Sequence, residues 1–162
     1  MNVRALMNPD VKYAGTDASV ADVIAIMEKN DCGVVPIVNA QNKVVGMITD
    51  RDICLALGPR PLPAAGIPVT EVMSRRVFAC GSDEEIPAAL RTMKNKKVRR
   101  LPVIDNGRLV GILSMDDVVM HAEARKAEKV EKKPELDYGQ AVDTLKAIYD
   151  RPSARKELIA RP

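Results

Sequence analysis

The chain has 162 residues, a formal net charge of +3 and 46% hydrophobic residues, so it can bury a core. Aromatic residues make up only 2%, which favours helices and buried strands of Val, Ile, Leu, Ala and Met over an all-β sandwich. The nearly balanced charge argues against nucleic-acid binding as the main task. No run approaches the roughly 20 apolar residues of a membrane span, and the N-terminus shows no secretory signal, so we expect a cytoplasmic protein.

Residues for catalysis or metal binding are scarce. The three cysteines, Cys32, Cys54 and Cys80, are widely spaced, and His121 is the one histidine of the sequence. We therefore interpret the cysteines as small buried hydrophobes in a reducing compartment. The sequence contains no nucleophile–base pair, no cluster of metal ligands and no Walker-type phosphate loop. We predict no catalytic residues, no metal site and no enzymatic activity.

The decisive feature of the sequence is an internal repeat. Matching residues recur 66 positions apart, and after one polar loop they recur 65 positions apart. The loop at residues 39–42 is one residue longer than its counterpart at 105–107, a difference that a turn between strands tolerates. The matched pairs are Met7 and Met73, Met27 and Met93, Pro36 and Pro102, Gly46 and Gly111, Thr49 and Ser114, and Asp52 and Asp117.

The first repeat predicts a β-α-β-β-α unit. A short helix ends at residues 6–7, and a strand is expected near 11–14. Ser19 is a good N-cap for an amphipathic helix whose apolar stripe is Val20, Val23, Ile24 and Met27. Two apolar strands at 34–38 and 44–48 follow, and a second helix begins at Asp50.

The second repeat predicts the same order of elements. A short helix ends at residues 72–73, and a strand is expected near 77–80. Because Pro87 fits only the first turn, the next helix should begin near Glu85, with Ile86, Leu90 and Met93 as its stripe. Strands at 101–104 and 109–113 follow, and the last helix of the repeat begins at Met115.

These patterns predict an α/β (α+β) fold, with two repeats packed sheet to sheet about a pseudo-two-fold axis, because neither unit alone covers both faces of its sheet. We expect the first repeat at residues 1–57, a semi-rigid linker with four prolines at 58–68, the second repeat at 69–120 and a charged helical extension at 121–162.

Within the C-terminal extension, the pattern predicts a helix from Val118 to about Lys133, a break at Pro134 and another helix at 137–149. The last helix would carry Val142, Leu145 and Ile148 or Tyr149 on one face. A short amphipathic helix needs a surface to pack on, which is its own module, its dimer mate or an external partner.

Each repeat ends its last strand with a hydroxyl residue, and an aspartate follows three positions later. Thr49 or Ser114 at a helix start offers a hydroxyl beside unpaired backbone N–H groups, a combination that favours a phosphate. Asp52 or Asp117, one turn away on the same face, can accept hydrogen bonds from both hydroxyls of a ribose. The alternative is that Thr49 and Ser114 are plain N-caps and the aspartates merely complement the helix dipole.

The segments at 46–52 and 111–117, with the upstream Val-Met pairs and the proline-containing strands, resemble the signature of the CBS domain, named after cystathionine β-synthase. The resemblance covers residues 1 to about 120 and implies a stand-alone tandem pair, or Bateman module. Such pairs bind adenosine-containing ligands between their halves and regulate another protein. AMP, ADP or ATP is favoured here, and NAD or S-adenosylmethionine is less favoured. We also expect a homodimer and an unidentified regulated protein partner.

In related modules each cleft borrows residues from both repeats. Carried over to this sequence, the first cleft contains Thr49, Arg51, Asp52, Phe78, Cys80, Ser82, Arg99, Arg100, Leu101 and Pro102. The second contains Ser114, Asp116, Asp117, Tyr13, Thr16, Val34 and Val35. Such a partition gathers three arginines in the first cleft, which would make it the main phosphate site.

The basic run at residues 94–100 has two interpretations. Its lysines suit a solvated helix C-terminus, whereas Arg99 and Arg100 at the start of a strand favour phosphate contact. The run lacks the interleaved aromatic residues on which bases stack, which argues against nucleic acid as the ligand. The alternative to the sensor function is a ligand-free dimerisation or scaffold module. Clefts filled by the protein's own side chains would indicate this alternative.

Overall fold

The computed structural model describes residues 1–59, 61–122 and 138–149. The described residues form two compact units: one comprises residues 1–7, 80–101, 112–122 and 138–149, and the other comprises residues 8–59, 61–79 and 102–111. We call the first the α3 unit and the second the α1 unit, after a helix that each contains: α3 (Ile86–Lys96) and α1 (Val20–Lys29). The predicted mixed α/β class is confirmed.

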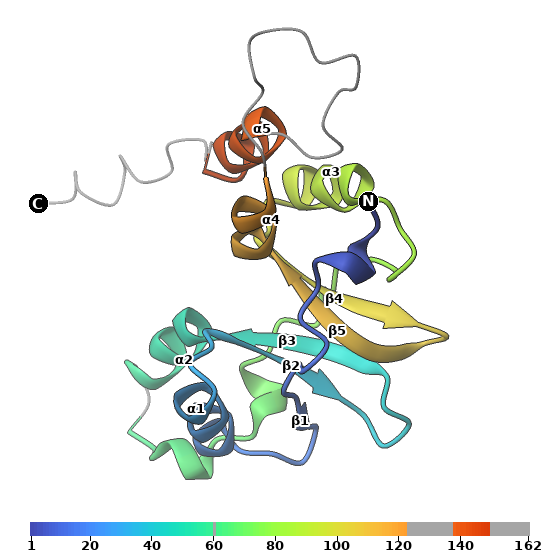
Figure 1. Cartoon of the computed structure of the whole chain (residues 1–162). Coiled ribbons are helices and arrows are strands. Elements are labelled where there is room, and N and C mark those ends of the chain that lie inside the picture. The colour runs from blue at the N-terminus through green and yellow to red at the C-terminus, as the bar shows by residue number, and fades with distance from the viewer. Residues whose placement is uncertain (60, 123–137, 150–162) are drawn as a thin grey trace, which may run out of the picture. The chain divides into compact units, whose positions relative to one another are not determined.

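In the α1 unit, a three-stranded sheet has the order β1 (Ala14–Gly15), β2 (Val34–Val38), β3 (Val44–Thr49). β1 runs parallel to β2, and β2 pairs antiparallel with β3. β2 is buried along its whole length, whereas β3 alternates between buried and half-buried residues. Helices α1 and α2 (Asp50–Leu57) pack together beside this sheet (Figure 1).

Helix α1 begins as the sequence predicts but buries a narrower stripe. Ser19 caps it, and Val20, Val23 and Met27 enter the core. Ile24 is 37% exposed, so its place in the predicted core stripe is wrong. Ile26 instead packs against the core, because the sheet lies on that side of the helix.

In the α3 unit, α3 begins directly after Glu85 with Pro87 in its first turn, as predicted. Strands β4 (Arg100–Asp105) and β5 (Arg108–Ser114) form a two-stranded sheet. Residues 102–111, which include the turn between these strands, belong to the α1 unit. Helix α4 (Met115–His121) follows β5 directly. Asn106 and Gly107 have φ of 49° and 77°, the left-handed conformations that a tight turn between strands requires.

Both predicted first strands are misplaced. β1 covers Ala14–Gly15 instead of residues 11–14, and of the predicted residues 77–80 only Cys80 takes part in a β-bridge. Residues 11–13 and 77–79 therefore lie outside the sheets, because a strand exists only where a neighbour pairs with it. In the α1 unit that neighbour is the end of β2, where Ala14 is opposite Ile37 and Gly15 is opposite Val38.

The leading segment of each repeat is hydrogen-bonded into the other repeat. Val3, in the short helix η1 (Val3–Ala5), donates its N–H to Glu84 O at 2.8 Å, and Ile86 N–H donates to Met1 O at 3.0 Å. Val3 is fully buried. The second repeat's leading segment makes the corresponding bonds with the first repeat.

In the α1 unit, Val69, in η3 (Val69–Glu71), donates its N–H to Ala18 O at 3.0 Å, and Val20 N–H donates to Ile67 O at 2.9 Å. Val69 and Ile67 are buried, and the short helix η2 (Ala64–Gly66) packs on α1. The end of the proline-rich segment is therefore part of a core.

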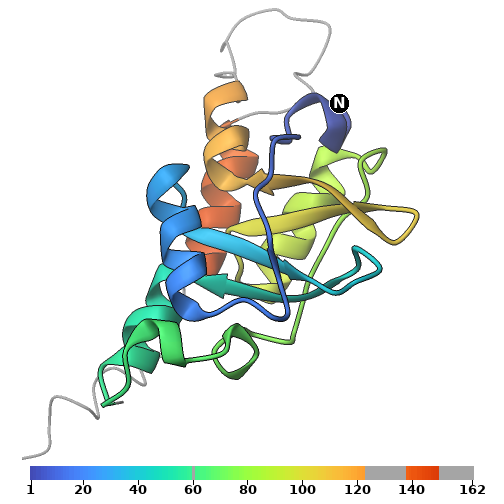
Figure 2. The ribbon, with the colours of Figure 1, turned by 90° about the horizontal axis from the view of Figure 1, so that it is seen from below.

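The C-terminal helix α5 (Tyr138–Tyr149) confirms the predicted helix at 137–149 and packs on α3 and α4 in its own unit (Figure 2). Its packed face is Ala141, Thr144 and Ile148, whereas Val142 is 44% exposed, so the predicted face was wrong by part of a turn. The helix expected from Val118 to Lys133 ends at His121 as far as described, and its remainder with Pro134 lies outside the described residues.

One burial expectation needs correction. Cys80 is buried and Cys32 half-buried, but Cys54 is exposed on α2, so it is not a core residue. None of the helices in the described ranges is long and apolar enough to cross a membrane.

Gly46 allows the segment after η3 to approach β3. Met47 and Ser74 exchange two backbone hydrogen bonds at 3.0 and 2.8 Å. A Cβ on Gly46 would lie 2.3 Å from Met73 Sδ, 2.9 Å from its Cγ and 3.3 Å from its Cβ. Met73 is accordingly buried here.

We predict that Gly46→Ala lowers the free energy of unfolding by about 1–3 kcal/mol, because the added methyl group overpacks this contact. Chemical denaturation measures the loss. Gly81→Ala is the matched control, since a Cβ there meets nothing within 4 Å. Adding Met73→Ala should make the two effects non-additive; an equal loss for Gly46→Ala in both backgrounds would contradict the contact.

Candidate functional site

The two strand-to-helix junctions have nearly the same geometry. Thr49 caps α2 with φ −115° and ψ 161°, and Ser114 caps α4 with φ −113° and ψ 161°. In the first junction, Asp52 Oδ2 accepts hydrogen bonds from Thr49 N–H at 2.9 Å and from Thr49 Oγ1 at 2.7 Å. Asp52 N–H in turn donates to Thr49 Oγ1 at 3.2 Å.

The second junction repeats these bonds: Asp117 Oδ2 accepts from Ser114 N–H and Ser114 Oγ, both at 2.7 Å, and Asp117 N–H donates to Ser114 Oγ at 3.2 Å. Each junction is therefore a reciprocal capping box. In the described residues, the hydrogen bonds to both aspartates use Oδ2 alone, so Oδ1 of each carboxylate is left to accept from a ligand.

The first residue of each helix is also hydrogen-bonded to the residue that precedes the first strand of the antiparallel pair, β2 or β4. Asp50 N–H donates to Gly33 O at 3.3 Å, and Met115 N–H donates to Arg99 O at 2.9 Å. Gly33 and Arg99 occupy matching repeat positions, 66 apart. We call Gly33 and Arg99, the residues just before β2 and β4, the strand entrances. In each repeat the strand entrance and the helix start therefore lie side by side.

A third capping box shows what this geometry means by itself. At the start of α1, Asp22 Oδ2 accepts from Ser19 N–H at 2.8 Å and from Ser19 Oγ at 2.7 Å, and neither residue is a predicted ligand contact. The backbone and hydroxyl hydrogen bonds from Ser19 lower the pKa of the Asp22 carboxyl. The N-cap interpretation of Thr49 and Ser114 is thus confirmed as a structural role.

The predicted site residues differ in accessibility. The side chains of Val34, Val35, Cys80, Ser82, Leu101 and Pro102 are buried. Phe78 is half-buried, and Arg100 is half-buried at the start of β4. The exposed residues are Tyr13, Thr16, Arg51, Arg99 and Asp116. The buried members offer a ligand their backbone groups, whereas the exposed members offer side chains.

Ser82 has a partner that the sequence analysis missed. The Arg4 guanidinium donates to Ser82 Oγ, and it also lies 3.3 Å from Asp83 Oδ1. Arg4 N–H donates to Ser82 O at 2.8 Å. Because Arg4 belongs to the leading segment of the other repeat, 78 positions away, no local pattern could have revealed this contact.

The predicted phosphate-binding arginines belong to both compact units, Arg51 to the α1 unit and Arg99 and Arg100 to the α3 unit. Arg99 is bonded through its carbonyl to Met115, at the helix start of its own repeat, whereas Arg51 lies in the first turn of α2 in the α1 unit. Asp116 follows Met115 directly. The assignment of Arg99 and Arg100 to the cleft of Asp52 remains a prediction.

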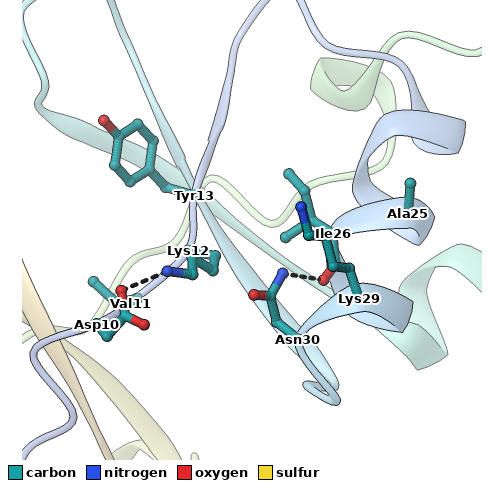
Figure 3. A pocket seen from close by; sticks show the side chains of 8 residues that line it. All are labelled: Asp10, Val11, Lys12, Tyr13, Ala25, Ile26, Lys29 and Asn30. Carbon is teal, nitrogen blue, oxygen red and sulfur yellow. Dashed lines mark hydrogen bonds and ion pairs between the residues drawn. The ribbon is translucent and has the colours of Figure 1, made fainter.

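An open pocket of about 690 Å³ lies within the α1 unit (Figure 3). Segment 10–13, with Lys12 and Tyr13, forms one wall, and residues of α1, including Lys29 and Asn30, form the other. Lys12 is paired with Asp10. The exposed Tyr13, a predicted base contact, thus borders a hollow of the size that small-molecule ligands occupy. Among the described residues no group of three His, Cys, Asp or Glu could hold a metal ion.

A family model for the CBS domain matches residues 3–58 and 69–123. The chain therefore belongs to the CBS domain family and carries two copies of the domain. It is 32% identical to hypoxic response protein 1 of Mycobacterium tuberculosis over 121 residues, which is 73% of this chain and 82% of that protein. It is 28% identical to an uncharacterized protein of Methanopyrus kandleri over 120 residues, 74% of this chain but only 61% of that relative.

Among solved structures, the CBS domain pair of protein MJ0100 in complex with 5′-methylthioadenosine and S-adenosyl-L-methionine resembles this chain with a TM-score of 0.67. The two are 26% identical, and the match covers 74% of this chain and 94% of that one.

The capping boxes make a prediction about stability. Asp52→Ala and Asp117→Ala should each lower the free energy of unfolding by about 0.5–2 kcal/mol, because each loses the carboxylate hydrogen bonds that complete a capping box. Urea denaturation at neutral pH measures both. Unchanged midpoints in both variants would contradict the capping role.

Asp22 predicts a pH dependence. Its pKa is lowered in the folded protein, so its stabilising effect is complete above its ordinary value of 3.8 and is lost as the pH falls through the lower folded value. The urea midpoints of wild type and Asp22→Asn should therefore converge on acidification. A constant difference down to pH 2 would exclude this linkage.

Proposed function

We propose that this chain is a regulatory module that binds an adenosine-containing ligand and modulates a protein partner without catalysing a reaction. The observation that carries the proposal is the pair of matching junctions, each combining a hydroxyl, a carboxylate with one uncommitted oxygen and an adjacent strand entrance. A ribose fits a carboxylate of this kind because two neighbouring hydroxyls can donate to it. AMP, ADP or ATP is the proposed ligand class, and the proposal includes a homodimer.

The adenosine compounds in the MJ0100 complex support the ligand class, since that protein's domain pair resembles this chain. Its S-adenosyl-L-methionine also shows why this ligand and NAD belong in any screen. The proposed clefts join residues of both repeats as the family resemblance implies. The proposed organisation is a first repeat at 1–57, a linker at 58–68, a second repeat at 69–120 and the C-terminal extension.

Because Asp52 also caps α2, a binding test needs a variant that loses a cap elsewhere. Asp52→Ala should weaken nucleotide binding by about 1.5–3 kcal/mol, the usual cost of losing hydrogen bonds to a charged group. Asp22→Ala removes the same kind of cap from α1 and should leave the affinity unchanged. Isothermal titration calorimetry with AMP and ATP measures both at a temperature where each variant is folded.

Equal weakening by Asp22→Ala and Asp52→Ala would trace the effect to helix stability and refute the ribose role. A preceding thermal-shift screen selects the ligand, since a compound at 100 times its Kd adds about 2.7 kcal/mol to stability. No shift with any adenosine compound, together with no binding by calorimetry, would favour the second candidate, a ligand-free scaffold. The structural capping role of both aspartates is the observation that favours that candidate.

We further propose that the two sites are unequal, because Arg51 in the first junction matches Asp116 in the second, while Arg99 and Arg100 match Gly33 and Val34. Phosphate binding should follow the arginines. Arg99→Ala combined with Arg100→Ala is expected to weaken ATP at least tenfold and adenosine much less, by calorimetry. Two equal, high-affinity ATP sites per chain would contradict the inequality.

The same titration decides which junction the arginines serve. If the double variant and Asp52→Ala remove the same ATP site, the crossed arrangement is supported. If the double variant and Asp117→Ala remove the same site, Arg99 and Arg100 act in their own repeat, beside the Met115 bond.

A further inference from the structure

The loops that lead into α1 and α3 match in sequence but differ in their surroundings. Residues 15–19 precede α1, and residues 81–85 precede α3 at positions 66 further along the chain. The proposed clefts take Thr16 from the first loop and Ser82 from the second. A structural difference between the two loops is therefore a difference between the two proposed sites.

In the first loop, the carboxylate of Asp17 fills the space beside Gly15. A Cβ on Gly15 would collide with Asp17 Oδ1 and would lie 3.5 Å from Asp17 Cγ. None of the described residues forms an ion pair with Asp17 that would draw its carboxylate elsewhere. The loop thus covers its own backbone with an acid, where a ligand would have to approach.

In the second loop, the corresponding space is open. A Cβ on Gly81 would meet nothing within 4 Å. Asp83, which matches Asp17, has its Oδ1 3.3 Å from the guanidinium of Arg4 instead. Since glycine has no side chain, an open glycine allows a ligand to approach the backbone closely.

Arg4 is held over the second loop by Ser82 as well as by Asp83. Its backbone N–H donates to Ser82 O at 2.8 Å, and its guanidinium donates to Ser82 Oγ. Ser82 is fully buried, whereas its counterpart Thr16 is exposed. Because an exposed ion pair alone contributes little to stability, the bonds to Ser82 are what keep the guanidinium beside Asp83.

The first loop has no such cation. The leading segments of the two repeats make matching backbone hydrogen bonds, from Val3 and from Val69. The position of Arg4 in the first of these segments is occupied by Thr70 in the second. A threonine hydroxyl carries no charge with which to draw Asp17 away from its glycine.

We propose that Arg4 is a positioning residue that keeps the site containing Ser82 open, because it holds Asp83 away from Gly81. The same proposal makes Asp17 the group that closes the site containing Thr16. This inference rests on the proposed function and adds a cause for the unequal sites that is independent of the phosphate-binding arginines. It requires no contact between Arg4 and the ligand.

Titration calorimetry of the full chain with AMP tests the role of Arg4. Arg4→Ala releases Asp83 and should weaken AMP about fivefold or more, because a carboxylate then competes for the ligand's space and repels its phosphate. Adding Asp83→Ala should restore the affinity to within about twofold, since the interfering acid is then absent. Circular dichroism and urea denaturation confirm that both variants fold.

The double variant separates positioning from a merely structural role. If Arg4 only fastens the leading segment to Ser82, removing Asp83 cannot rescue binding. An unrescued loss, or an unchanged AMP affinity in Arg4→Ala, would therefore overturn the proposal.

Stoichiometry tests the role of Asp17. Asp17→Ala should open the first loop and raise the number of AMP molecules bound per chain from one to two. Glu28→Ala is the matched control, because it removes the same charge from an exposed position of α1 and should leave the number at one. A wild type that already binds two AMP molecules equally, or an Asp17→Ala variant that still binds one, would overturn the closing role of Asp17.

A measurement without ligand distinguishes failure of this inference from failure of the proposed function. A wild type that binds no adenosine compound would refute the function. Nuclear Overhauser effects should still connect Gly15 to the side chain of Asp17 in wild type, and should connect Gly81 to the side chain of Asp83 only in Arg4→Ala. Absence of the second contact in Arg4→Ala would refute the positioning role, whatever the ligand does.

Discussion

The fold depends on the hydrogen bonds that tie the leading segment of each repeat to the other repeat. Val3 and Val69 are fully buried, and each donates its N–H to the carbonyl that precedes the capping residue of a helix from the other copy. In this way α1 and α3 each begin against a strand-like segment that their own repeat does not supply. Neither repeat is complete alone, which explains why the sequence carries two.

This exchange also explains why the sequence repeats and the compact units differ. A repeat is defined by matching residues along the sequence, whereas a compact unit is defined by contacts in space. The 1–7 segment belongs to the first repeat by sequence and to the α3 unit by its bonds. The Arg4–Ser82 interaction follows from the same exchange, because it places a cation from the chain's first turn beside a buried hydroxyl. A change in either leading segment therefore acts on the other repeat's helix.

The candidate site uses groups that the fold already needs. Thr49 and Ser114 satisfy backbone N–H groups at helix starts, and their aspartates complete the caps. A capped helix start is held in one conformation before a ligand arrives, which reduces the entropy that binding must overcome. The first N–H of α1 donates to Ile67 O, in the leading segment of the other repeat. What sets the two junctions apart is that their first helical N–H donates to a residue of the same repeat, Gly33 or Arg99, which precedes a strand.

The sequence by itself determined the repeat, the order of most elements and the helix starts, because caps, prolines and apolar periodicity act over a few residues. Ser19, Thr49, Glu85 and Ser114 begin their helices where local chemistry places them. The family signature at the two junctions is local in the same sense. The exposure of Ile24 and the set of α5 residues that are packed could not be predicted from local patterns, because both depend on which other element covers the helix. The short β1, the missing strand at 77–79 and the Arg4–Ser82 contact were likewise decided by tertiary structure, since pairing partners far apart in the chain determine them.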